Sequence, residues 1–255
     1  MSPLEALALL GAGIAAGGIN AIAGGGSLLS FPALVGIGLP SVAANVSNAL
    51  SVAPGYGASV LGSRPDLAGQ GRRIARIVPT VVLGAIGGSA LLLLTPRAVF
   101  DYVVPFLVLG ATAMLAFQNK LRDLAGHPKD NSPRRAALLL HLAVFLCGLY
   151  GGYFNAALGV LLIAGLALVL DEPLRRVSAL KNVLSAVVGL TTVLIYSIFG
   201  PVNWAAVGVL APATIIGGFV GARLARRLPS HILRYLIITF GTVVGVILLV
   251  RALTG

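Results

Sequence analysis

Long apolar runs constrain this chain more than any other feature. Of its 255 residues, 58% are hydrophobic and 10% are charged, whereas about 25% of residues are charged in an average soluble domain. The runs have the length of a helix that crosses a bilayer and lack the alternation of membrane β-strands. Inside lipid, only helices and closed barrels satisfy their own backbone hydrogen bonds. The sequence therefore predicts an all-α polytopic membrane protein and excludes a soluble domain, a disordered chain and a disulfide scaffold.

Two of the eight apolar segments are too long for one crossing and short for two. Segments 4–39 and 136–170 have 36 and 35 residues, where one crossing takes about 20 residues and two take about 40. Glycines interrupt both, at 24–26 in the first and at 151–152 and 159 in the second. We expect each to be two half-helices joined inside the membrane. The other six segments are each expected to cross once: 42–62, 77–94, 98–118, 178–199, 203–222 and 232–253.

The second half of the chain repeats the first. Five residues recur at a constant offset of 133 positions over a stretch of 24 residues, which indicates a duplication. Asn48 has a similar counterpart in Asn182. We predict two repeats, 1–118 and 136–255, each a broken helix pair followed by three transmembrane helices, joined by the polar cytoplasmic linker 119–135. The repeated pairs are Pro79 and Pro212, Gly84 and Gly217, Gly88 and Gly221, Pro96 and Pro229, and Tyr102 and Tyr235.

The basic residues predict the orientation. If each broken segment enters and leaves the membrane on the same side, 16 of the 18 lysines and arginines share one side, in loops 63–76, 119–135, 171–181 and 222–234. Only Arg97 and Arg251 then fall on the other side; if each broken segment crosses once, the split is 10 to 8. Cytoplasmic loops are rich in Lys and Arg, which favours the first arrangement. It gives inverted-topology repeats with both termini outside, an architecture typical of secondary transporters with a midplane site.

The distribution of acidic residues disfavours a cation substrate. None of the seven acids lies well inside a predicted span, whereas cation carriers and many proton pumps place carboxylates in the membrane. An anion instead needs donors, and half-helix N-termini supply free N–H groups and a positive dipole end. Gly25, Gly26 and Gly152 would let a small anion approach the backbone; their alternative role is to break helices and allow close packing. We expect no metal site and no cofactor.

Two predicted spans carry polar side chains on one helical face. At 1.5 Å per residue, Asn48 is about 12 Å from the outer boundary and Asn182 about 10 Å from the inner one. Both therefore reach toward the midplane of a core about 30 Å thick. Hydrogen bonding between helices is the alternative role for such residues. The polar sets are Asn45, Asn48 and Ser51 in the first span, and Ser178, Lys181, Asn182 and Ser185 in the second.

Three further residues leave alternatives open. Lys181 either pairs with an anion or extends to the inner surface and serves topology. His141 is either a proton-coupling group or, more commonly for such a residue, a hydrogen-bonded packing residue. Cys147 is the single cysteine, so it forms no internal disulfide, and we expect it to pack. The net charge of +11 is explained by the basic loops, so no nucleic-acid partner is expected.

Two blocks of sequence carry a resemblance to a known family. The first reads Ala-Gly-Gly-Ile-Asn-Ala-Ile-Ala-Gly-Gly-Gly-Ser over 16–27, followed by Phe-Pro-Ala-Leu over 31–34 and Gly-Leu-Pro-Ser-Val-Ala-Ala-Asn over 38–45. The second reads Gly-Leu-Tyr-Gly-Gly-Tyr-Phe-Asn-Ala-Ala-Leu-Gly over 148–159, followed by Ala-Leu-Lys-Asn-Val-Leu-Ser over 179–185. Together they resemble the sulfite exporter TauE/SafE family of bacterial and archaeal membrane transporters.

The resemblance implies transport of small anions, often sulfur-containing: sulfite, thiosulfate and organosulfonates. It also implies a multi-pass protein of the prokaryotic inner membrane. Two departures leave the substrate open. Asn155 stands where members often have glycine, and the block from Asn45 to Asn48 stands where a threonine is common.

We therefore predict a secondary transporter, an exporter of small anions by alternating access, with an anion channel of the same fold as the alternative. An intramembrane enzyme is disfavoured because the chain has no G-x-S-x-G, H-E-x-x-H or Walker A motif. The expected partners are a small anionic substrate and the lipid bilayer, with a homodimer left open. The candidate substrate-binding residues, around one midplane cavity, are Asn20, Gly25, Gly26, Ser27, Asn45, Asn48, Ser51, Gly152, Asn155, Lys181, Asn182 and Ser185.

Overall fold

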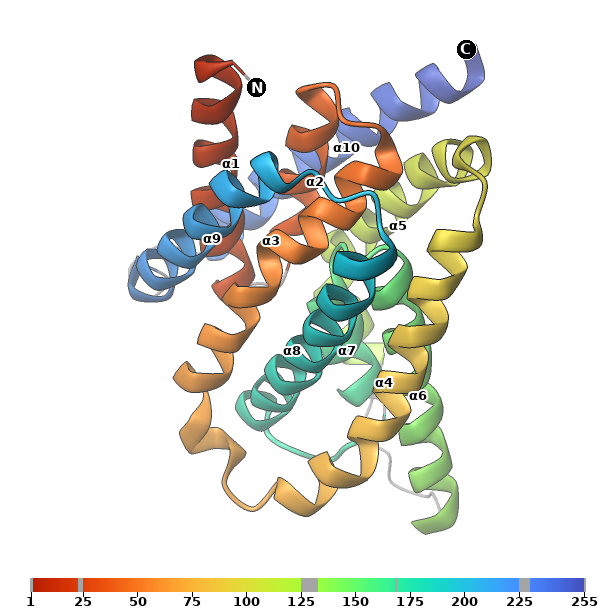
Figure 1. Cartoon of the computed structure of the whole chain (residues 1–255). Helices are drawn as coiled ribbons and strands as arrows, with labels where there is room; N and C mark the ends of the chain where they lie inside the picture. Colours follow the sequence, from red (N-terminus) through yellow and green to blue (C-terminus); the bar gives the residue numbers. More distant parts are fainter. Residues whose placement is uncertain (1, 23–24, 125–132, 168, 225–229, 255) are drawn as a thin grey trace.

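The computed structural model describes residues 2–22, 25–124, 133–167, 169–224 and 230–254 (Figure 1). Within these ranges the chain forms α-helices, one short 3-10 helix and no strand, which confirms the all-α prediction. The elements are α1 (Pro3–Ile22), α2 (Ser27–Gly36), α3 (Ser41–Gly62), η1 (Arg64–Leu67), α4 (Gly71–Leu94), α5 (Arg97–Leu124), α6 (Pro133–Tyr153), α7 (Leu158–Ala167), α8 (Leu174–Phe199), α9 (Trp204–Leu224) and α10 (Ser230–Thr254).

Five of these helices contain a stretch long and apolar enough to cross a membrane. Large apolar side chains on the same helices are exposed, among them Leu83 on α4 and Ile198 on α8. Lipid is the environment in which such an exposed apolar surface is stable. The structure therefore agrees with a multi-pass membrane protein. The five stretches are Pro3–Asn20, Gly71–Leu94, Arg97–Met114, Arg134–Tyr153 and Arg175–Phe199.

Both long apolar segments are interrupted, as predicted, but their pieces are unequal. The first pieces, α1 and α6, have 20 and 21 residues, so the expectation of two half-helices is wrong for them. The second pieces, α2 and α7, have 10 residues each. At 1.5 Å per residue they are about 15 Å long, half of a bilayer core. Each broken segment is therefore one full-length helix followed by a half-helix.

The second interruption also lies elsewhere than its glycines suggested. Gly151 and Gly152 are inside α6, and the chain leaves the helix only after Tyr153. Asn155 and Ala157 turn it with φ angles of 62° and 57°. A Cβ atom on Gly152 would collide with the backbone oxygen of Ala85 on α4. The glycine pair therefore allows close helix packing, and left-handed residues make the break.

Helices of one half of the chain pack on helices of the other half. α1 lies along α9, α6 lies along α4, and α3 and α5 contact α8 and α10 respectively. Glycines permit the closest approaches: a Cβ on Gly17 would meet the backbone of Thr214, and one on Gly88 would meet the backbone of Leu149. Small residues at three-residue gaps commonly allow such approaches in membrane helices. These glycines therefore allow the helices of the two halves to pack closely.

The two ends of the molecule differ in what they hold. The start of α1 and the end of α10 lie at one end, and η1 lies at the other with the starts of α4, α6 and α8 (Figure 1). Ion pairs join segments at the η1 end: Glu172 is 3.0 Å from Arg73 and 2.9 Å from Arg176. Between the ends, most of α2 and half of α7 are buried. The two half-helices thus place their breaks inside the protein.

Candidate functional site

The two helix breaks meet inside the protein. Phe31 of α2 packs edge-on against Phe154 of the second break, with ring centroids 5.3 Å apart and planes at 79°. Both rings are almost completely buried. Edge-to-face aromatic pairs of this kind stabilise a contact beyond simple burial. Half-helix α2, from the first half of the chain, therefore packs on the second helix break.

Tyr56 of α3 lies between the two breaks. Its hydroxyl donates to Asn155 Oδ1 of the second break, at 3.4 Å. The hydroxyl also faces Ser27, the first residue of α2, although Ser27 Oγ has no partner at hydrogen-bonding distance. Tyr56 was not among the predicted site residues. Its helical spacing could have indicated it, because Tyr56 follows Asn45 by 11 residues, which is about three helical turns and the same helical face.

Asn48 of α3 continues this polar group along α2. Ser30 Oγ, one turn after Ser27, donates to Asn48 Oδ1 at 2.5 Å. Asn48 is 1% exposed, and its Nδ2 has no hydrogen-bond partner. Asn155 likewise has an Nδ2 without a partner. We name Ser27, Ser30, Asn48, Tyr56 and Asn155 the central polar cluster.

Helix α8 passes this cluster at Gly189. A Cβ on Gly189 would lie 3.2 Å from the Tyr56 ring. Ser185 and Lys181 follow at four-residue steps toward the start of α8, so they share its face with Gly189. Ser185 Oγ is buried without a partner. Lys181 is 7% exposed, and within the described part of the chain no carboxylate lies within 4 Å of it.

Asn182 lies apart from the central polar cluster. Its Nδ2 donates to the backbone oxygen of Ser59 at 3.3 Å and to Ser63 Oγ at 3.1 Å. Ser59 is 11 residues beyond Asn48 on α3, which is about 16 Å along the helix. In this conformation Asn182 braces α8 against α3. Its predicted role in substrate binding stays a prediction.

Several other predicted site residues hold the protein's own backbone. Asn20 Oδ1 accepts a hydrogen bond of 2.8 Å from the backbone N–H of Gly26, where a Cβ would collide with the backbone of Ala16. Gly25 accepts a hydrogen bond from Leu28 at the start of α2, at 3.1 Å. Ser51 Oγ donates to the Ser47 oxygen of its own helix at 2.7 Å.

The side chain of Asn45 is hydrogen-bonded at one of its two polar atoms only. Its Nδ2 donates to the backbone oxygen of Tyr153 at 2.8 Å and so caps the end of α6, whereas its Oδ1 is buried without a partner. Tyr196 donates to the oxygen of Gly152 in the same helix end. Both side chains satisfy carbonyl groups that the end of α6 leaves free.

The residues left with alternatives can now be placed. His141 Nδ1 is 2.7 Å from Thr80 Oγ1 of α4, so it is a hydrogen-bonded residue between helices. Cys147 is buried in an apolar cluster with Val144 and Leu158. No group of three metal-binding side chains occurs in the parts of the chain that the structure describes.

The unmet groups of the site define its chemistry. Nδ2 of Asn48 and Nδ2 of Asn155 are buried donors without a partner, and Lys181 on α8 is buried with no carboxylate within 4 Å among the described residues. Helices α2, α3, α7 and α8 contain no Asp or Glu to accept from them. A buried donor without an acceptor costs about 1–3 kcal/mol. The asparagine donors can bind an anion, whereas Asn45 Oδ1, also buried without a partner, can only accept a hydrogen bond.

Known proteins resemble this chain over most of its length. A curated membrane protein of Haemophilus influenzae, described as a probable membrane transporter protein, is 29% identical over 228 residues, which cover 89% of this chain and 87% of that protein. The probable membrane transporter protein YfcA of Escherichia coli K12 is 28% identical, covering 89% and 82%. A probable membrane transporter protein of a Sinorhizobium species is 24% identical, covering 93% and 88%.

No solved structure matches this chain. The family model described as sulfite exporter TauE/SafE matches residues 9–248, almost the whole chain. This agrees with the resemblance of the two glycine-rich blocks. The chain therefore belongs to the sulfite exporter TauE/SafE family of membrane transporters.

Proposed function

We propose that this protein is a secondary transporter that exports small anions, with sulfite, thiosulfate or organosulfonates as substrates. The observation that carries the proposal is the pair of buried donors without acceptors, Nδ2 of Asn48 and Nδ2 of Asn155, with the buried Lys181 farther along α8 as the nearest candidate cation. Membership of a transporter family supplies the reaction class. An anion held by the two asparagines lies beside α2 and the second helix break, and transporters commonly bind substrate at such breaks.

Alternating access follows if the two halves are inverted repeats, 1–118 and 136–255. The packing pattern supports this, because exchanging the halves turns the α1–α9 contact into the α6–α4 contact. The same exchange maps the α3–α8 and α5–α10 contacts onto themselves. Each half also contains one long helix, one half-helix and three further helices. Residues 125–132 of the linker 119–135 lie outside the described residues.

In this proposal both termini face outward from a prokaryotic inner membrane, since the basic loops belong inside. A reporter that is active only in the cytoplasm, fused to Gly255, should give no signal. A strong signal would contradict the orientation. The proposed partners are the substrate anion and the lipid bilayer, with a homodimer as the assembly to be tested by mass measurement.

The central experiment measures binding by thermal unfolding of purified protein. Thiosulfate, sulfite and sulfoacetate, at matched ionic strength with sodium chloride, should raise the unfolding temperature, because a ligand that binds only the folded state stabilises it. Asn48→Ala and Lys181→Met should each remove most of the shift, since hydrogen bonds to charged groups contribute about 1.5–3 kcal/mol. Arg72→Gln, an exposed change on α4, is the matched control and should leave the shift intact.

Two outcomes would contradict the proposal. Either no anion shifts the unfolding temperature, or both Asn48→Ala and Lys181→Met bind as well as the unaltered protein. Asn182→Ala in the same assay decides whether the site extends to Asn182.

An anion channel of the same fold is the second candidate. The unpaired donors fit a channel as well as a carrier, because the selectivity filters of channels are also built from backbone dipoles and charged side chains that lie close to the ion. Counterflow of labelled thiosulfate into loaded proteoliposomes selects the carrier. Flux far above carrier rates, without counterflow, selects the channel.

A further inference from the structure

Two arginines stand apart from all the other basic residues. Arg97 and Arg251 are the only Lys or Arg residues outside the four basic loops of the sequence. They belong to the start of α5 and the end of α10, 154 positions apart in the chain. Nevertheless both line one pocket of about 470 Å³, together with the connection from α2 to α3. The fold therefore gathers these two charges at the end of the molecule where α10 ends.

The pocket carries an excess of positive charge. In the described part of the chain, neither arginine has a carboxylate within 4 Å. Asp101, one helical turn after Arg97, also lines the pocket, and one of its oxygens is buried without a hydrogen-bond partner. Two guanidinium groups and one carboxylate leave a net charge of +1. Arginine is always charged and offers a planar set of donors that suits oxyanions.

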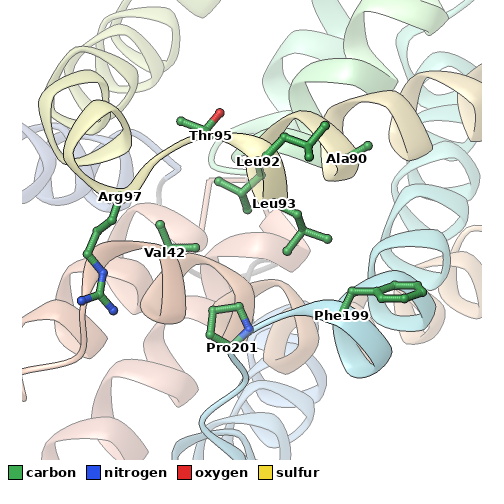
Figure 2. A pocket seen from close by; sticks show the side chains of 9 residues that line it. Val42, Ala90, Leu92, Leu93, Thr95, Arg97, Phe199 and Pro201 are labelled. Carbon is green, nitrogen blue, oxygen red and sulfur yellow. The ribbon is translucent and has the colours of Figure 1, made fainter.

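This pocket lies apart from the central polar cluster, toward the other end of α2. Val35, near the end of α2, lines the pocket, whereas Ser27 of the cluster begins the same helix. Eight residues of helix separate the two positions, or about 12 Å. Arg97 also borders a second, more apolar pocket of about 510 Å³ with Val42, Phe199 and Pro201 (Figure 2). The excess of positive charge therefore belongs to the pocket that holds both arginines.

We propose that the pocket between Arg97 and Arg251 is a second binding site, which takes a small dissolved anion from solution. The two arginines attract the anion, and Asp101 weakens that attraction. This inference goes beyond the proposed function and does not depend on the central polar cluster. If the proposed orientation holds, the site faces outward, where an exported anion leaves the protein.

The test uses the charge selectivity of a cysteine reaction inside the pocket. Cys147 is the single cysteine and is buried, so Cys147→Ala with Ser41→Cys places one thiol at a lining position. The purified protein is reacted with methanethiosulfonates that carry either a sulfonate or a trimethylammonium group. The rate with the sulfonate reagent divided by the rate with the trimethylammonium reagent should fall about fivefold or more in Arg97→Gln with Arg251→Gln, because both charges lie within the screening length.

Asp101→Asn provides the matched change of opposite sign. It keeps the size of the side chain and removes the negative charge, so the same ratio should rise. Ser2→Cys, which is exposed and is not among the residues that line the pocket, is the control and should keep its ratio within about twofold in every variant. An unchanged ratio at Ser41→Cys in either the arginine or the aspartate variant overturns the proposal.

A protection experiment separates a dissolved anion from a lipid headgroup. Inorganic phosphate at constant ionic strength should slow the sulfonate reagent at Ser41→Cys saturably, and this protection should disappear in the double arginine variant. Nanodiscs of phosphatidylglycerol and of phosphatidylcholine give the lipid arm. Protection by phosphatidylglycerol alone, with none by phosphate, overturns the proposal in favour of a lipid contact.

Discussion

The two helix breaks are made by different means. The first break lets Gly26 approach α1 closely, and the side chain of Asn20 holds the Gly26 N–H. The second break turns through left-handed Asn155 and Ala157. There Tyr150 of α6 donates to the oxygen of Ala156 at 2.7 Å.

This difference decides which asparagine is free to bind a ligand. The amide oxygen of Asn20 already accepts a hydrogen bond from the backbone N–H of Gly26. Asn155 keeps an unpartnered Nδ2 beside Tyr56. We therefore expect the first break to serve mainly stability and the second to serve mainly binding.

The largest expected effect is on the first break. Gly26→Ala adds a Cβ where the backbone of Ala16 already lies, and backbone cannot move aside as a side chain can. Overpacking of this kind typically costs about 1–3 kcal/mol, and we expect the upper part of that range. Gly36→Ala is the control, since nothing lies within 4 Å of a Cβ there. Unfolding of both variants in detergent measures the difference, and equal stabilities would show that the approach of α2 to α1 is not tight.

A test of the second break isolates the side chain of Asn155. Asn155→Gly removes the amide, while glycine adopts a φ of 62° without strain. We expect the affinity for thiosulfate to fall about tenfold or more, because hydrogen bonds to charged groups contribute about 1.5–3 kcal/mol. Calorimetric titration measures the affinity, and thermal unfolding shows that the variant still folds. Normal affinity would remove Asn155 from the site.

Asn20→Ala should have the opposite profile. The Gly26 N–H loses its partner in a buried place, and an unsatisfied buried group costs about 1–3 kcal/mol. The affinity for thiosulfate, measured on the fraction that folds, should change less than about threefold, since the amide oxygen of Asn20 is already engaged. If Asn20→Ala loses affinity as strongly as Asn155→Gly, both breaks contribute to binding and the contrast is wrong.

The same contrast explains how far the sequence could be read. The first break was placed correctly because three adjacent glycines lie within an apolar run and cannot sustain a helix there. The second was misplaced because its two glycines serve packing: Gly152 lies against α4, and Gly151 lies against Leu158 and Val188. Of the two residues that make the turn, Asn155 belongs to a type that is enriched in the left-handed region, but Ala157 is a strong helix former and gives no local signal.

The candidate site was predicted in part for a related reason. Helical spacing indicated Asn48 on α3, and it lies in the central polar cluster. Tyr56 was missed because an aromatic residue in an apolar span is usually core. Its place in the site depends on the hydrogen bond from its hydroxyl to Asn155, which is 99 positions away in the sequence. Asn182 was paired with Asn48 through the repeat, but its partners are Ser59 and Ser63, and no local pattern indicates them.

The smallest expected effect concerns the backbone of the second break. Ala157 has a φ of 57°, a conformation that costs a residue with a Cβ about 1–2 kcal/mol. Ala157→Gly removes this cost but also a buried methyl group, worth about 0.8 kcal/mol, and it adds chain entropy worth about 0.5–1 kcal/mol. These terms nearly cancel, so we expect a stability within about 1 kcal/mol of the unaltered protein.

Ala156→Gly is the matched control: Ala156 is equally buried but lacks the positive φ. It has no strain to lose and should be destabilised by about 1–2 kcal/mol. Chemical unfolding of the pair measures the difference directly, and equal losses would mean that the left-handed turn at Ala157 stores no strain.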